Sequence, residues 1–182
     1  MKIAIGSDEK TVLTDFVVEE LKRRGHTLTL FGPLKGEAMG WPDVGEKVGL
    51  ELGKGRAEQG VVFCWTGTGV TIAANKVRGV RAALCWDAET AKGARLWDDA
   101  NVLAMSLRST SNAVAKEILD SWFSTTAATS GIDAELIERG RRWTRNIFIP
   151  QRNRFDLPRA LRESHGVGLL PQGCRTKVRR CP

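Results

Sequence analysis

Five short apolar runs, separated by segments of helical periodicity, constrain this chain more than any other feature of its sequence. The runs are four to six residues long and are typical of strands that are buried on both faces. Between them, apolar residues recur at intervals of three and four, as on a helix that buries one side. Strands that alternate with helices predict an α/β domain in which helices cover both faces of a parallel sheet. The expected strands are residues 2–6, 26–31, 60–64, 81–85 and 102–105.

The segments between and after these strands predict six helices. Pro42 suits the first turn of the second helix, and Ser111 or Asn112 suits the N-cap of the fifth. Beyond about residue 149 the periodicity is weak and four prolines occur, so we expect a domain of residues 1–149 followed by an irregular extension of residues 150–182. The expected helices cover residues 13–24, 42–52, 70–76, 88–96, 112–122 and about 132–145.

The net charge of +7 is concentrated in the C-terminal part of the chain. From Arg139 onward there are 12 Lys and Arg against two acids, Asp156 and Glu163, whereas the preceding residues hold 16 basic and 19 acidic side chains. A basic tail can contact nucleic acid or an anionic surface, but such tails are more often solvated or bridge subunits. We therefore expect no nucleic-acid partner, and keep a tail-mediated interaction as an alternative.

The composition also argues against a membrane protein and against a metal centre. No run of eighteen apolar residues occurs, and the N-terminus lacks the pattern of a secretory signal, which predicts a cytoplasmic protein. The four cysteines follow no metal-ligand spacing, and Cys64 and Cys85 each end an apolar run, as reduced thiols on strands do. With only two histidines, we expect no bound metal.

The segment Gly60–Lys76 carries the clearest chemical pattern. Ligands of an open parallel sheet bind beyond the carboxyl ends of its strands, and Cys64 stands at such an end. Gly67 and Gly69 follow directly, in a loop that leads into a helix, where backbone amides can hold a phosphate or an oxyanion. A thiolate beside such amides suits proton abstraction next to a carbonyl, with the enediolate held by the amides. Each feature taken alone is more common in simple packing.

Taken as a whole, the segment resembles the ribose-5-phosphate isomerase B family, which includes the galactose-6-phosphate isomerase subunits. That family shows a strand, the pattern C-G-T-G-x-G-x-x-x-A-A-N-K and then a strand R-A-A-L-C. The resemblance extends over residues 1 to about 125. It rests on Ile3–Asp8, Trp41-Pro42-Asp43, Cys64-Trp65-Thr66-Gly67-Thr68-Gly69, Ala73–Lys76, Arg81–Cys85, Asp99–Leu103 and Ala115–Ile118.

The resemblance implies a Rossmann-like three-layer αβα sandwich with a five-stranded parallel sheet. It also implies a homodimer, doubled to a tetramer in many relatives, with active sites between subunits and no metal or organic cofactor. The reaction would be aldose–ketose isomerisation of a small sugar or sugar phosphate through a cis-enediolate. By position, the catalytic residues would be Cys64 as the base, Thr66 for ring opening and Asp98 as a substitute acid. The substrate-binding residues would be Asp8, Glu9, Trp65, Gly67, Thr68, Gly69, Val70, Trp97, Asn101 and Arg108.

Several positions depart from the family pattern. Glu9 replaces a phosphate-binding His, and a carboxylate there would repel a dianion. Trp97 and Asp98 replace the His-Asn pair whose His opens the ring, and Asp98 could act as the acid only if its pKa is raised. Trp65 replaces a glycine in the loop, and Val44 replaces a tyrosine that often lines the sugar pocket. Relatives without the cysteine use a glutamate at the position of Val70, so this chain retains the cysteine route.

These departures leave two functions open. The retained loop favours an isomerase, acting on a tetrose or pentose phosphate or on a less phosphorylated sugar. Glu9 and Trp97 favour a non-catalytic relative that binds a sugar or a phosphate in an altered pocket. Arg139, Arg141 and Arg142 lie in the general place of the family's phosphate-binding arginines, but the surrounding G-G-R-H pattern is missing.

Overall fold

The computed structural model describes residues 1–147, and the predicted extension of residues 150–182 lies outside the described part. A five-stranded, wholly parallel sheet forms the centre, in the order β2-β1-β3-β5-β4. Its central strands read as continuous buried apolar runs, as expected for strands covered on both faces. The strands are β1 (Lys2–Ser7), β2 (Thr27–Phe31), β3 (Gln59–Cys64), β4 (Ala82–Leu84) and β5 (Val102–Ser106).

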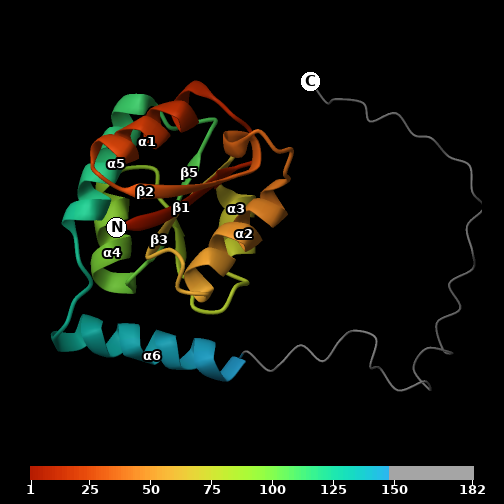
Figure 1. Cartoon of the computed structure of the whole chain (residues 1–182). Coiled ribbons are helices and arrows are strands. Elements are labelled where there is room, and N and C mark those ends of the chain that lie inside the picture. The colour runs from red at the N-terminus through yellow and green to blue at the C-terminus, as the bar shows by residue number, and fades with distance from the viewer. Residues whose placement is uncertain (148–182) are drawn as a thin grey trace, which may run out of the picture. The chain divides into compact units, whose positions relative to one another are not determined.

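Helices cover both faces of the sheet, which confirms the predicted three-layer sandwich (Figure 1). One face packs against α1, α4 and α5, and the other against α2 and α3. Alternate strand residues divide between the two cores, so that Phe63 faces α1 and α5 while Cys64 faces α2 and α3. The helices are α1 (Val12–Arg23), α2 (Trp41–Gly53), α3 (Thr68–Ala74), α4 (Ala88–Asp98), α5 (Asn112–Ser124) and α6 (Gly131–Ile147), with a short 3₁₀ turn at Gly32–Lys35.

Several helix and strand boundaries differ from the sequence prediction. The third helix begins at Thr68 rather than Val70, because Gly67 takes a left-handed conformation and caps it. The fourth strand begins at Ala82 rather than Arg81, since the Arg81 amide binds the Asn101 side chain at 2.8 Å. The last helix extends to Ile147, two residues beyond the predicted end.

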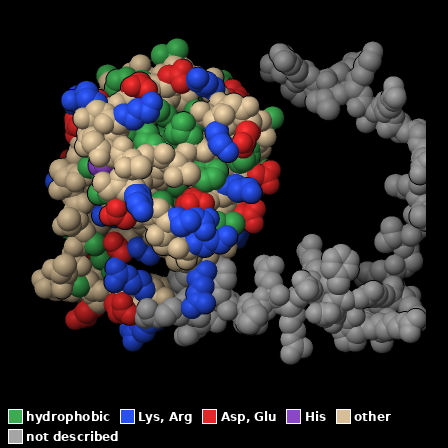
Figure 2. Space-filling model, viewed as in Figure 1, with side chains coloured by type: hydrophobic (Ala, Val, Ile, Leu, Met, Phe, Trp, Pro, Cys, Tyr) green, Lys and Arg blue, Asp and Glu red, His purple; other side chains and the backbone are tan. Residues whose placement is uncertain are grey.

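Charged side chains of both signs are interspersed on the face of residues 1–147 that Figure 2 shows. This agrees with the near-balance of charge before Arg139. None of the helices in the described part is both long and apolar enough to cross a bilayer.

An ion-pair cluster joins α1 to α5 on the outside of the sandwich. The carboxylate of Glu20 is almost buried and accepts hydrogen bonds from Arg23 (2.7 and 2.9 Å) and from Arg24 (2.9 Å). Arg24 in turn binds Asp120 on α5 at 2.5 Å. The hydrogen bonds from Arg23 and Arg24 lower the pKa of Glu20 from 4.5 to about 2.

We expect this cluster to make the free energy of unfolding depend on pH in the acidic range. Because the folded pKa of Glu20 lies below its ordinary value, its contribution is complete above about pH 4.5 and is lost as the pH falls toward 2. The difference in the free energy of unfolding between wild type and Glu20→Gln should therefore shrink across this interval. Urea unfolding of both proteins at a series of pH values measures it, and a difference independent of pH would contradict the expectation.

Candidate active site

The carboxyl ends of β1, β3 and β5 meet at one edge of the sheet. Register pairs Ser7 with Phe63, and Cys64 with Ser106, so the residues that follow these strands emerge side by side. This is the edge at which open parallel sheets bind ligands. It carries the predicted site residues Asp8, Glu9, Arg108 and the whole Cys64–Val70 loop.

Main-chain hydrogen bonds attach the loop after β3 to the loop after β5. The Leu107 amide donates to the Cys64 carbonyl at 3.1 Å, and the Arg108 amide donates to the Trp65 carbonyl at 3.0 Å. The Ser106 hydroxyl donates to the same Trp65 carbonyl at 2.9 Å. The exposed Arg108 is thereby held beside the cysteine loop, although the two are over forty residues apart in sequence.

The Cys64 thiol lies at the point where the sheet ends and α3 begins. Its side chain is 4% exposed and packs in the same cluster as Val70 of α3. The Thr66 and Thr68 hydroxyls lie 2.7 Å apart at the exposed tip of the loop. The predicted placement of a thiol beside a helix N-terminus is therefore present in the fold.

The resemblance places four substrate-binding residues at this helix start, Gly67 to Val70, and two of their amides already bind within the chain. Gly67 donates to the Cys64 carbonyl at 3.1 Å, and Thr68 makes a long bond of 3.4 Å to the Thr66 hydroxyl. The first bond within the helix runs from Thr71 to the Gly67 carbonyl. Helix geometry thus leaves the amides of Gly69 and Val70 without an acceptor inside the helix, and these two can serve an anion.

Trp41 lies against this loop, and sequence reasoning did not identify it as a site residue. A Cβ built on Gly69 would lie 3.0 Å from the Trp41 ring, so the indole covers the second residue of α3. Trp41 begins α2 and is 43% exposed. Val44, which the resemblance placed along the sugar pocket, is fully buried in the core and offers no surface to a ligand. The Trp-Pro pair at a helix start was the available signal.

Asp8 brings an unusual carboxylate to the same edge. Its Oδ1 atom is buried and has no hydrogen-bond partner among the described residues, and buried polar atoms in that state are rare. Burial, with a smaller contribution from the neighbouring Glu9 carboxylate, raises the pKa of Asp8 above its ordinary value. Glu9 is exposed, and its backbone is held by the buried Ser7 hydroxyl.

The structure places the remaining predicted residues at the opposite edge of the sheet. A helix that joins two parallel strands runs back along them, so α4 starts at the carboxyl edge with its cap Asp87 and ends at the amino edge. Trp97 and Asp98 end that helix, and Asn101 precedes β5. The three predicted catalytic residues, Cys64, Thr66 and Asp98, therefore do not meet within one chain.

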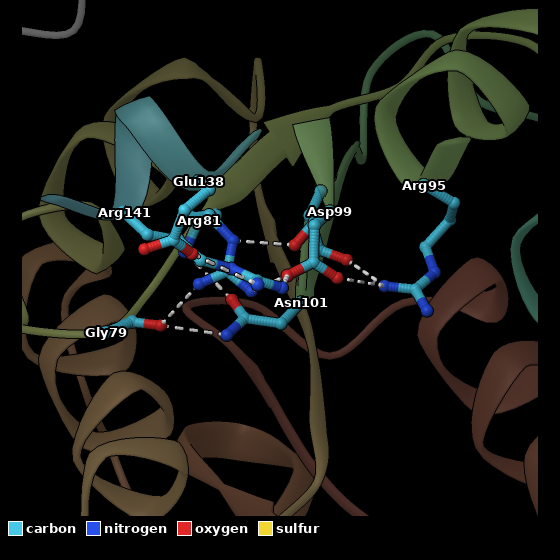
Figure 3. A network of polar contacts seen from close by, with 8 residues as sticks. Gly79, Arg81, Arg95, Asp99, Asn101, Glu138 and Arg141 are labelled. Carbon is cyan, nitrogen blue, oxygen red and sulfur yellow. Dashed lines mark hydrogen bonds and ion pairs between the residues drawn. The ribbon is translucent and has the colours of Figure 1, made fainter. Parts of the chain in front are cut away.

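The amino-edge residues have distinct environments. Trp97 is 57% exposed and its ring lies along Gly93, where a Cβ would come within 2.7 Å. Partial desolvation raises the pKa of Asp98, in the direction that an acid at this position requires. Asn101 instead uses its carboxamide for folding, accepting from the Arg81 amide and donating to the Gly79 carbonyl, both at 2.8 Å (Figure 3).

Comparison with known proteins assigns this αβα sandwich, with its strand-ending thiol and glycine loop, to a class of sugar isomerases. Residues 3–139 match the Ribose/Galactose Isomerase family. The chain is 37% identical over 123 residues to ribose-5-P isomerase B of Listeria innocua, covering 67% of this chain and 83% of that one. It is 36% identical over 124 residues to D-erythrulose-4-phosphate isomerase of Pectobacterium atrosepticum, covering 67% and 82%.

A solved structure agrees as well. Ribose-5-phosphate isomerase B of Clostridium thermocellum superposes with a TM-score of 0.73 at 35% identity, covering 80% of this chain and 99% of that one. The chain belongs to the Ribose/Galactose Isomerase family.

Proposed function

We propose that this protein is an aldose–ketose isomerase that acts on a small sugar or sugar phosphate. The observation that carries the proposal is the Cys64 thiol, placed where β3 ends, beside the two amides that α3 leaves without a helical acceptor. Thiolate and amides together suit the transfer of a proton next to a carbonyl, since one takes the proton and the others hold the oxyanion.

In the proposed reaction, the Cys64 thiolate removes the proton from C2 of the open-chain aldose. The electrons of that bond form the C1–C2 double bond, and the carbonyl oxygen on C1 becomes the oxyanion of a cis-enediolate. The amides of Gly69 and Val70 donate to it. The proton then returns to C1 while the O2 proton moves to O1, which yields the ketose. No external oxidant or reductant is needed.

Other residues of the same edge supply recognition. The unpartnered Asp8 oxygen suits a sugar hydroxyl, which would satisfy a buried acceptor. Thr66, at the loop tip with Thr68, would assist ring opening. Arg108, held beside the loop by its own amide, would reach a phosphate. Trp41 and Trp65 are partly exposed and offer ring faces for the sugar.

The Cys64 loop lies at one edge of the sheet, and Trp97 and Asp98 lie at the other. This separation supports a site that is shared between two copies of the chain. We propose a homodimer, or a tetramer built from such dimers, in which Trp97 and Asp98 of one copy face the Cys64 loop of the other. Asp98, whose pKa is raised, would then act as the ring-opening acid. Asn101 is left out of the substrate contacts, because its carboxamide is already used within its own chain.

The residues that depart from the family pattern affect which substrate the site would accept. Glu9 adds a second carboxylate next to Asp8, which disfavours a dianionic phosphate at that point. Four- and five-carbon sugar phosphates are the natural first candidates, because the relatives include isomerases named for both. A non-catalytic role in sugar or phosphate binding is the second candidate, favoured by Glu9 and by the exposed Trp97 in place of a proton donor.

A substrate panel separates the two functions. Aldoses of four, five and six carbons, with and without a terminal phosphate, are incubated with the protein in D₂O. An isomerase should give a ketose that carries solvent deuterium at C1, with kcat of at least about 1 s⁻¹ on its best substrate. Thermal-shift binding without turnover of any aldose would support the binding role and contradict the isomerase.

We place this activity in the cytoplasm, without a metal, an organic cofactor or a nucleic-acid partner. The two cysteines of the described part, Cys64 and Cys85, are both free thiols, which suits a reducing compartment.

A further inference from the structure

Asp99, the residue that follows Trp97 and Asp98, has an unusual backbone. Its φ of 48° and ψ of 41° are left-handed, and among the residues that the structure describes it is the one non-glycine with positive φ. Glycine is the usual residue at such a helix end, and an L-residue there costs about 1 kcal/mol. The contacts of the Asp99 side chain offset this cost.

Three arginines from separate elements converge on the Asp99 side chain, as Figure 3 shows. Arg81, before β4, reaches Oδ2 at 2.6 Å and also donates from Nε to the Asp99 carbonyl at 2.7 Å. Arg141 of α6 binds the same Oδ2 at 2.5 Å, and Arg95 of α4 lies 4.0 Å from Oδ1. The Asp99 side chain is only 15% exposed, so these charge-assisted bonds are partly shielded from water.

Further bonds hold the same turn. Arg95 donates to the Ala100 carbonyl, and the Ala100 amide donates back to the Ala94 carbonyl at 2.9 Å. The Ala128 amide, just before α6, donates to the Leu96 carbonyl at 3.0 Å. The Trp97–Asp98 pair is therefore fixed to the sheet through Arg81 and to α6 through Arg141 and Ala128.

We propose that Asp99 is a positioning residue, which orients Trp97 and Asp98 toward the substrate and makes their placement depend on the docking of α6. The inference rests on the proposed function. Arg81 and Arg141 already bind the Asp99 carboxylate within its own chain, so it acts through its neighbours rather than on the sugar itself. Removal of its charge should loosen the turn and the part of α6 around Arg141 together.

Two substrates separate positioning of the ring-opening group from a general loss of structure. A five-carbon aldose 5-phosphate closes to a furanose and must be opened. A four-carbon aldose 4-phosphate has its O4 blocked and stays open, so it needs no ring-opening acid. In Asp99→Asn and Asp99→Gly, which both tolerate positive φ, we expect kcat/KM to fall tenfold to about a hundredfold on the five-carbon substrate. On the four-carbon substrate it should change less than about threefold.

Hydrogen exchange supplies a readout that needs no turnover. The amides of residues 96–101 and of α6 around Arg141 should exchange at least about tenfold faster in Asp99→Asn. Glu51→Gln is the matched control, since it removes a comparable bidentate arginine pair, with Arg56 at 2.6 and 2.9 Å, at the end of α2. It should alter neither exchange at 96–101 nor the ratio of the two substrates.

Two results would overturn the inference. One is exchange at residues 96–101 in Asp99→Asn that equals that of the wild type. The other is an equal loss on both substrates, which a merely structural role would give. Because exchange is measured without substrate, failure of this inference and failure of the proposed isomerase activity remain distinguishable.

Discussion

Replacement of Cys64 by alanine is expected to lower kcat about a thousandfold while the fold persists. Loss of a positioned base costs about 10²–10⁴ in rate, and the other thiol of the described chain, Cys85, is fully buried. The side chain is small, so the cavity should cost only about 1 kcal/mol of stability. Steady-state rates on the best substrate of the panel, together with urea unfolding, measure both effects.

Cys85 provides the matched control for this variant. It is also a buried cysteine that follows a strand, but burial raises the pKa of its thiol to about 12, so it stays protonated at neutral pH. Cys85→Ala should therefore cost similar stability and leave kcat within about threefold. A Cys64→Ala protein that retains a tenth of the activity, or an equal loss in Cys85→Ala, would contradict the assignment of the base.

The same variant can also show whether the site is shared between copies. An Asp98→Asn protein keeps its own Cys64, and a Cys64→Ala protein keeps its own Asp98. If one site draws on both copies, a mixed dimer of the two inactive proteins holds one complete site. Mixing after partial unfolding should then restore a measurable fraction of wild-type activity, whereas a site within one chain would stay inactive.

Replacement of Gly67 by alanine should have the largest effect on stability within the loop. Its φ of +78° is left-handed, and an added Cβ would lie 2.4 Å from Leu84 Cδ1 and 3.2 Å from the Met105 carbonyl. Strain of about 1–2 kcal/mol and overpacking of about 1–3 kcal/mol together predict a loss of about 2–5 kcal/mol. Because the loop would also shift, kcat should fall about a hundredfold.

The Gly25→Ala variant separates the backbone strain of such a substitution from the steric overpacking. Its φ of +80° matches that of Gly67, but an added Cβ would meet nothing within 4 Å. Gly25→Ala should therefore show the backbone strain alone, about 1 kcal/mol, with unchanged kcat. Denaturant unfolding of both variants gives the comparison, and equal losses would show that the approach of Leu84 and Met105 does not matter.

The order of strands and helices, the three layers and the reactive loop could all be predicted from the sequence. These features are local or periodic: a continuous apolar run marks β3, and a glycine pair marks the turn from it into α3. Asp98 lies away from Cys64 because α4 runs antiparallel to the strands. The alternation of strands and helices in the sequence already predicts that direction.

Contacts between distant segments could not be predicted in the same way. The Trp41 ring lies over Gly69 because α2 packs against α3, and the Trp-Pro pair marks the helix start without indicating this contact. Asn101 resembles a ligand residue in sequence, but its bonds to Arg81 and Gly79 give it a structural role. Likewise, the arginines that meet at Asp99 come from three separate stretches of chain, and side-chain chemistry alone does not pair them.

The attachment of Trp65 through its backbone carbonyl leaves its side chain free to vary during evolution. Backbone bonds to Ser106 and Arg108 hold this residue, while its indole is 57% exposed and takes no part in the attachment. Position 65 can therefore accept almost any side chain without disturbing the thiol beside it. Natural selection could change the preferred sugar there, one substitution at a time, while the reaction chemistry is inherited unchanged.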